Sequence, residues 1–202
     1  KEAEKYRDKR LVENLVMTSV MEYVRIYGME NTEGMDRIFR KRVRRADYVA
    51  EYQRVYDANK VLFKGQPAVP FTFKDITGKE VSLSDLKGKY VYIDVWATWC
   101  GPCNAEIPHL KKLEEEFEGR NICFVSISCD DSQKAWERFV QAKQLGGIQL
   151  HMGGDKSFME AIRCKGIPRF LLIDQDGKFL NANMSRPSDG KTLEILNALP
   201  GL

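Results

Sequence analysis

The feature that most constrains this chain is a pair of cysteines placed where a buried strand should turn into a helix. Residues 96–103 read Trp-Ala-Thr-Trp-Cys-Gly-Pro-Cys, and residues 90–96 read Tyr-Val-Tyr-Ile-Asp-Val-Trp. Such a nearly continuous apolar run is typical of a strand buried on both faces of a parallel sheet. Loops that follow these strands often carry functional residues. We therefore expect a functional site at the two cysteines, at the start of a helix that runs to about Phe117.

The spacing of Cys100 and Cys103 lets their sulfurs close a small disulfide ring, because the two residues lie one helical turn apart. Cys100 precedes the first turn, where unpaired N–H groups and the positive end of the helix dipole stabilise a thiolate. The pKa of a cysteine so placed falls from about 8.5 toward about 7 or lower. We predict that Cys100 is the attacking sulfur and that the more shielded Cys103 is the resolving sulfur.

The number of cysteines favours redox chemistry over their other uses. Five Cys in 202 residues do not form a disulfide framework, and one Cys-Xaa-Xaa-Cys with two His is a poor zinc site. A metal half-site or a chance pair is the alternative. We predict no metal and no cofactor beyond a redox-active Cys100–Cys103 disulfide. Cys123 and Cys129 are predicted to be buried core thiols on one strand, and Cys164 is either a bystander or a third redox thiol.

Two acidic residues are candidates for proton transfer. Asp94 lies within the buried strand, where an isolated carboxylate costs several kcal/mol unless it is neutralised or paired. Burial would raise its pKa, so that it could take a proton from Cys103; a carboxylate hydrogen-bonded at the sheet edge is the alternative. Glu106 lies three residues beyond Cys103 on the same helix face, and it either joins this proton transfer or is solvated.

The chain changes in character near residue 64. Residues 1–64 contain no Pro, only two Gly, and apolar residues at helical spacing, which predicts a helical hairpin or three short helices. A linker follows at 64–70, and short β-rich runs separated by turns begin at residue 71. We therefore predict a helical N-terminal segment at 1–64 and an α/β domain at 65–202.

The expected elements of residues 65–202 are those of an α/β fold. A β-hairpin is expected over 71–83, strands over 90–96 and 122–127, and a short strand near 149–151. The run Asp130-Asp-Ser132 is expected to cap a second long helix, and a short helix follows at 158–162. A second hairpin over 170–180 and a helix over 192–199 complete the domain. Pro168 stands just before this hairpin, in a cis or an ordinary trans peptide bond.

Together these motifs resemble a known fold. Trp-Cys-Gly-Pro-Cys, an Asp six residues before Cys100, a Pro eight residues after it and a downstream Gly-Ile-Pro are similar to thioredoxin. The insertion between Cys129 and Pro168, the leading hairpin and Glu106 resemble the TlpA/ResA-like thiol-disulfide oxidoreductases, which are related to AhpC/TSA proteins. The resemblance covers about residues 65–202. It implies a thioredoxin-like α/β fold, a central mixed sheet flanked by helices with an N-terminal β-hairpin and a central αβ insertion, preceded here by an all-α segment.

The resemblance also implies roles for single residues. It implies that Asp94 is the buried acid, that Pro168 is cis, and that the backbone of Ile167 pairs with an extended substrate. The residues expected to contact substrate flank the cysteines or this proline: Trp99, Gly101, Pro102, Ile167 and Pro168. TlpA/ResA-like proteins commonly have Thr before the proline and another dipeptide between the cysteines. Here Ile167 and the Gly-Pro dipeptide resemble thioredoxin, which favours a reductant.

We therefore expect a thiol-disulfide oxidoreductase that reduces disulfides of proteins or small molecules and receives electrons from an upstream donor. The alternative is a redox-switched binding module in which residues 1–64 hold a partner, and a thiol peroxidase is a weaker third hypothesis. The resemblance favours the periplasm or cell envelope of a bacterium over the cytoplasm. The chain begins at Lys1 without an initiator Met and shows no signal or anchor, which is typical of a processed or trimmed product.

Charge is distributed unevenly between the two parts. The chain has 32 basic and 29 acidic residues, a net charge of +3, which is too balanced to imply a polyanionic partner. Residues 1–64 carry 15 basic and 11 acidic groups, and residues 65–202 carry 17 basic and 18 acidic groups. The basic run at 40–45 is expected to be a solvated face, with an acidic partner protein or a phospholipid membrane surface as the alternative. Nucleic acid is not an expected partner, because no basic stripe with stacking aromatics follows.

Overall fold

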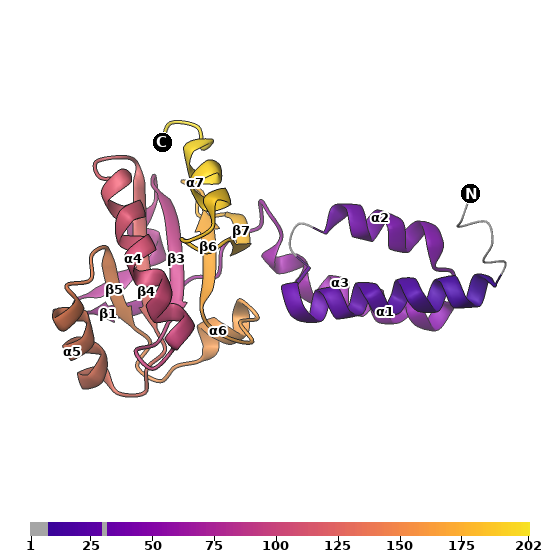
Figure 1. The fold of residues 1–202 in the computed structure, drawn as a ribbon, viewed down its shortest axis with the longest axis horizontal. Helices are drawn as coiled ribbons and strands as arrows, with labels where there is room; N and C mark the ends of the chain where they lie inside the picture. The colour runs from indigo at the N-terminus through magenta and orange to yellow at the C-terminus, as the bar shows by residue number, and fades with distance from the viewer. Residues whose placement is uncertain (1–7, 30–31) are drawn as a thin grey trace. The chain divides into compact units, whose positions relative to one another are not determined.

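The computed structural model describes residues 8–29 and 32–202, whose fold is shown in Figure 1. The chain divides into two compact units, with the boundary between Lys64 and Gly65. Residues 1–7 and 30–31, which belong to the expected helical segment, lie outside the described part. Each unit has its own core.

Helices form the first unit. They are α1 (Lys9–Tyr27), α2 (Glu33–Arg42), α3 (Ala46–Asn59) and the 3-10 turn η2 (Lys60–Leu62). The first of these begins at Asp8, whose side chain accepts a hydrogen bond from the N–H of Arg10. Apolar residues from all three α-helices and from the α1–α2 connection meet in one core: Val20, Val24, Met29, Phe39, Val43 and Tyr52. Of the two arrangements predicted for this segment, the structure has three helices.

The basic residues around the end of α2 make contacts within this unit. Arg40 pairs with Asp36 at 2.8 Å, and its guanidinium lies 5.6 Å from the ring centroid of Tyr52. The guanidinium of Arg45 lies 3.9 Å from the ring centroid of Tyr48, a distance typical of a cation–π contact. Both arginines remain exposed. The basic run is therefore an exposed face whose side chains are oriented by neighbouring aromatic and acidic groups.

One mixed sheet of seven strands forms the centre of the second unit. The strands are β1 (Thr72–Asp75), β2 (Glu80–Ser82), β3 (Tyr90–Trp96), β4 (Ile122–Ser128), β5 (Ile148–His151), β6 (Arg169–Ile173) and β7 (Phe179–Met184). Their order across the sheet is β2-β1-β5-β4-β3-β6-β7. β3, β4 and β5 run parallel, whereas the remaining neighbours are antiparallel. This sheet, with both predicted hairpins, confirms the predicted α/β fold class.

The second unit also contains helical segments. They are η3 (Leu83–Leu86), α4 (Gly101–Glu116), α5 (Gln133–Lys143), α6 (Ser157–Ala161) and α7 (Gly190–Asn197). Figure 1 shows α4 lying across β3 and β4. Among the described residues of both units, no helix is long and apolar enough to span a bilayer.

The face of the sheet under α4 positions the site. All seven residues of β3 are buried, and its side chains alternate between the two faces. Tyr90 and Tyr92 pack in a core with residues of α4 and its C-cap, β4, β6, β7 and α7: Leu110, Leu113, Phe117, Ile122, Phe124, Phe170, Leu172, Met184 and Leu196. Asp94 follows at the same alternation, so its carboxyl group points to the face that α4 covers.

The structure corrects one prediction about the remaining cysteines. β4 ends at Ser128, so Cys129 lies in the loop after the strand and does not share the strand with Cys123. Both thiols belong to partly exposed residues. The prediction that they are buried core thiols on one strand is therefore wrong, because the strand ends one residue too early to include Cys129.

Candidate active site

Cys100 is the N-cap residue of α4, and Cys103 lies in the first turn of that helix. The Sγ of Cys100 accepts a hydrogen bond from the N–H of Cys103 at 3.2 Å. The two sulfurs form a disulfide bond. Both residues are buried, at 5% and 4% exposure. After reduction, N–H groups at the helix start would stabilise a thiolate at Cys100, which is the chemistry expected of an attacking sulfur.

The residues predicted to contact substrate lie beside this disulfide. Trp99 is 69% exposed, and Gly101 and Pro102 are also exposed at the start of α4. The Ile167–Pro168 peptide bond is cis. Ile167 packs against the apolar cluster that contains both cysteines, and Pro168 lines a cavity that the second cysteine also lines. The fold therefore brings two segments that are distant in the sequence to one site.

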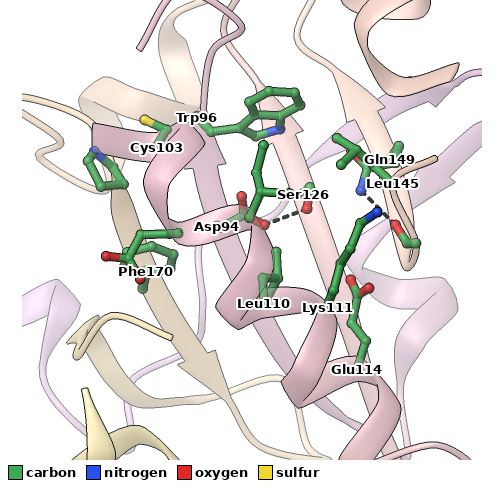
Figure 2. Close-up of a pocket in the computed structure, with 14 residues that line it drawn as sticks. Asp94, Trp96, Cys103, Leu110, Lys111, Glu114, Ser126, Leu145, Gln149 and Phe170 are labelled. Atoms are coloured by element: carbon green, nitrogen blue, oxygen red, sulfur yellow. Dashed lines mark hydrogen bonds between the residues drawn. The ribbon is translucent and has the colours of Figure 1, made fainter. Parts of the chain in front are cut away.

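Asp94 lies beneath α4 and is 8% exposed. Its Oδ1 accepts a hydrogen bond of 2.5 Å from the Oγ of Ser126, which lies opposite Asp94 in the register of β3 and β4. Burial raises the pKa of Asp94 to about 7; the Ser126 hydrogen bond opposes this rise and the charge of Glu114 adds to it. Asp94 and Cys103 line the same cavity (Figure 2). Of the alternative, a carboxylate hydrogen-bonded at the sheet edge, the hydrogen bond is present, but the edge position is wrong because β3 has a strand on each side.

Glu106 is 7% exposed, so the alternative that it is solvated is wrong. Its two carboxylate oxygens accept hydrogen bonds from the N–H and the Oγ of Ser188, each at 2.9 Å. The guanidinium of Arg186 lies 3.6 Å from Oε1. These contacts fix the Glu106 carboxylate against the segment before α7, while the residue also lines the cavity with Cys103 and Asp94.

Asp130 is a site residue that sequence reasoning assigned to a helix start. It is 3% exposed, and its carboxylate accepts hydrogen bonds from the N–H of Thr98 at 2.9 Å and from the Thr98 Oγ1 at 2.6 Å. Of the three residues predicted to cap the second long helix, Ser132 is the N-cap of α5. Asp130 therefore fixes the loop that leads to Cys100. The signal was present in the sequence, since loops that follow adjacent parallel strands meet at one edge of the sheet.

The other cysteines and the histidines form no metal centre in the described part of the chain. Cys129 packs against the cluster of the redox pair, and the Sγ of Cys164 contacts the carbonyl oxygen of Gly166 at 3.2 Å. Burial raises the pKa of both thiols. His109 is exposed, and His151 is buried with a ring nitrogen 2.8 Å from a backbone oxygen. Among the residues that the structure describes, no three metal-binding side chains gather.

Comparison with known proteins identifies the family. A sequence profile of the AhpC/TSA family matches residues 64–181, more than half of the chain. The chain belongs to the AhpC/TSA family. The thiol-disulfide oxidoreductase ResA of Bacillus subtilis is 26% identical over 151 residues, which cover 74% of this chain and 84% of that relative. ResA of Bacillus cereus is 30% identical over 133 residues, 64% of this chain and 74% of the relative.

Solved structures of similar proteins agree with this AhpC/TSA-family assignment. A proposed thiol-disulfide oxidoreductase from Bacteroides vulgatus is 61% identical, with a TM-score of 0.61 over 66% of this chain and 88% of that one. A proposed thiol:disulfide interchange protein DsbE from Chlorobium tepidum is 30% identical, with a TM-score of 0.59, and the match covers 67% of this chain and 96% of that one. Together with the Cys100–Cys103 disulfide, these relatives identify the chain as a thiol-disulfide oxidoreductase of the ResA-like group.

Proposed function

We propose that this oxidoreductase reduces disulfide bonds of proteins in a bacterial cell envelope, with Cys100 attacking and Cys103 resolving. The observation that carries the proposal is the position of Cys100 at the N-cap of α4, where its sulfur accepts the N–H of Cys103. A thiolate is stabilised there, and a thiolate of low pKa remains deprotonated at neutral pH.

The first step forms a mixed disulfide. The thiolate of reduced Cys100 attacks one sulfur of the substrate disulfide, the substrate S–S bond breaks, and the departing sulfur takes up a proton. Trp99, Gly101 and Pro102 present an exposed surface around the attacking sulfur. The backbone of Ile167 and the ring of Pro168 form the other border of the site, where an extended substrate segment would lie.

The second step releases the substrate. Cys103 gives its proton to the carboxylate of Asp94 and attacks the Sγ of Cys100, which breaks the mixed disulfide and frees the second substrate thiol. The protein is left with the Cys100–Cys103 disulfide that the structure contains. An upstream donor of two electrons and two protons then restores the dithiol. Glu106 borders the same cavity and contributes a second, fixed carboxylate to it.

The reducing direction is supported by the residues between and opposite the cysteines. Gly101 and Pro102 resemble the dipeptide of thioredoxin, and Ile167 resembles the residue before its cis proline. Dithiol couples on this fold range from about −270 mV in thioredoxin to about −120 mV in the oxidant DsbA, and the dipeptide is one determinant of this value. The envelope location and the protein substrates are supported by the resemblance to TlpA/ResA-like proteins and by the ResA relatives.

Replacing Cys103 tests the assignment of roles. In Cys103→Ser we expect substrates to remain covalently bound to Cys100, because the attack that releases them is lost. Incubation with insulin, followed by non-reducing electrophoresis and mass spectrometry, should show a dithiothreitol-sensitive adduct on Cys100. Steady-state insulin reduction should fall by about a hundredfold or more.

Cys123→Ser is the matched control, because Cys123 is a partly exposed thiol outside the cavity. Cys123→Ser should reduce insulin at the wild-type rate and accumulate no covalent adduct on Cys100. The roles would be wrong if no mixed disulfide accumulated on Cys103→Ser while Cys100 still reacted with iodoacetamide.

A further inference from the structure

A row of polar side chains crosses the buried face of the sheet beneath α4. The register places Asp94 opposite Ser126, and Ser126 opposite Gln149, on three adjacent parallel strands. All three side chains are buried, and together with Cys103 they line one cavity (Figure 2). On one side of this row the same face carries Tyr92 and Phe124, which belong to the aromatic and aliphatic core. Burying polar groups in such a place is costly, so the row calls for a role beyond packing.

Glu114 reaches the other end of this row from α4. It lies about three helical turns beyond Cys103 on the same helix face, and it lines the same cavity. A Cβ on Gly146 would lie 2.5 Å from the Glu114 Oε2, and one on Gly147 would lie 2.8 Å from its Oε1. The two glycines therefore leave the space that the carboxyl group occupies. In Figure 2, Asp94 lies between Cys103 and Glu114.

Gln149 supplies a hydrogen-bond acceptor at the far end of this row from Asp94. Its Nε2 donates to the carbonyl oxygen of Gly146 at 2.7 Å. Its Oε1 is buried and has no hydrogen-bond donor among the described residues. The cavity has a volume of about 20 Å³, which is the space that one water molecule needs. A protonated Glu114, or a water molecule bound to it, is the kind of donor that this oxygen lacks.

We propose that Glu114 is a positioning residue that acts through Asp94, the two carboxyl groups sharing one proton across this cavity near neutral pH. When Cys103 attacks, its proton passes to Asp94 and from there to Glu114, which releases it to solvent. Glu114 is suited to the last step because it is partly exposed, whereas Asp94 is buried. The inference rests on the proposed role of Cys103 as the resolving sulfur.

The charges around the pair agree with a shared proton. Burial raises the pKa of both Asp94 and Glu114 to about 7, and the charge of Glu114 raises that of Asp94 further. Lys111 opposes the rise at Glu114, and Glu115 adds to it. The other ionisable groups at the cavity or beside Asp94 are Cys103, Glu106 and Tyr92. Two carboxylates in such a site repel each other, so the ionisation of one hinders that of the other.

The test is a titration of the full chain with carbon-13-labelled side-chain carboxyl groups, followed by NMR from about pH 4 to about pH 10. In Glu114→Gln we expect the titration midpoint of Asp94 to fall by about half a pH unit or more, because the repelling charge is gone. The rate at which the mixed disulfide is resolved should begin to rise at a correspondingly lower pH. Glu115→Gln, which removes the same charge from an exposed neighbour, should leave the Asp94 midpoint close to that of the wild type, because Glu115 acts on Glu114 and not on Asp94.

Reciprocity gives a second measurement that does not depend on the first variant folding. If the two carboxyl groups are coupled, Asp94→Asn must lower the midpoint of Glu114 by the same amount. The proposal is overturned if the Asp94 midpoint is the same in Glu114→Gln and wild type, if the shifts are not reciprocal, or if Glu115→Gln has an equal effect. If the wild-type protein reduces insulin but the Asp94 midpoint does not change in Glu114→Gln, only the coupling is refuted. If the wild-type protein shows no thiol-disulfide exchange, the proposed function itself is refuted.

Discussion

The carboxyl group of Asp94 links the stability of this protein to pH. Its pKa is raised from 3.8 to about 7 in the folded protein, mainly by burial. The folded protein therefore holds this proton more tightly than the unfolded chain does. Its contribution to the free energy of unfolding is fully present below about pH 4 and is lost as pH rises through about 7. The loss amounts to about 4 kcal/mol at most, at about 1.4 kcal/mol per pH unit.

Replacing Asp94 with asparagine should remove this pH dependence. In Asp94→Asn we expect the free energy of unfolding at about pH 8.5 to rise by about 2 to 4 kcal/mol, because no buried carboxylate has to ionise. Near pH 4.5 the change should be within about 1 kcal/mol, since the wild-type carboxyl group is protonated there. Urea denaturation of the oxidised protein at both pH values measures the difference, with Asp131→Asn as an exposed control. A variant that destabilised the protein equally at both pH values would contradict this explanation.

At the residue scale, the sequence identifies groups whose chemistry conflicts with their surroundings. Asp94 could be predicted because a carboxylate interrupts an apolar strand, and the cysteines because their spacing fits the start of a helix. Glu114 could not, because it lies among other glutamates on α4. Its distinguishing contacts are with Gly146 and Gly147, which only the folded chain brings to it.

At the scale of elements, the start of α4 is fixed by contacts from the loop between β4 and α5. Asp130, two residues beyond the end of β4, accepts hydrogen bonds from Thr98 and from the Oγ of Ser128, the latter at 2.7 Å. Thr98 in turn accepts a hydrogen bond of 2.9 Å at its carbonyl oxygen from Asn104 in α4. These bonds join two strand-end loops and the helix into one unit, which holds the N-cap cysteine in place.

Removing the Asp130 carboxylate should loosen this arrangement. In Asp130→Ala we expect a loss of about 2 to 4 kcal/mol in the free energy of unfolding, because the partly buried donors of Thr98 and the buried hydroxyl of Ser128 lose their acceptor. The rate of Cys100 alkylation in the reduced protein should also change, since its loop is no longer fixed. Asp131→Ala, at the exposed neighbouring position, is the control. If both variants unfolded at the same urea concentration as the wild type, Asp130 would not have this role.

Element types were more predictable than element ends. Period-two and apolar patterns predicted both hairpins and the parallel strands, because each pattern reports local burial. β4 ends one residue beyond the predicted strand of 122–127, at Ser128, which still excludes Cys129. Its backbone N–H instead bonds to the carbonyl oxygen of Trp96, a contact that no local pattern contains.

At the scale of the whole molecule, the two units differ in charge and in what the comparisons cover. The AhpC/TSA match begins at residue 64, where the helical unit ends. The solved relatives described above cover 66% and 67% of this chain. A partner for the helical unit therefore stays a prediction from its net positive charge, whereas the redox chemistry belongs to the unit that the relatives share.

The reduction potential of the Cys100–Cys103 couple tests the proposed reductant most directly. The full chain would be equilibrated in glutathione and dithiothreitol buffers, and the fraction of disulfide measured by thiol labelling and mass spectrometry. We expect a value near −270 mV, close to that of thioredoxin, because the Gly-Pro dipeptide and the residue before the cis proline resemble that protein. A value near −120 mV would contradict it, because the couple would then be an oxidant of substrate thiols.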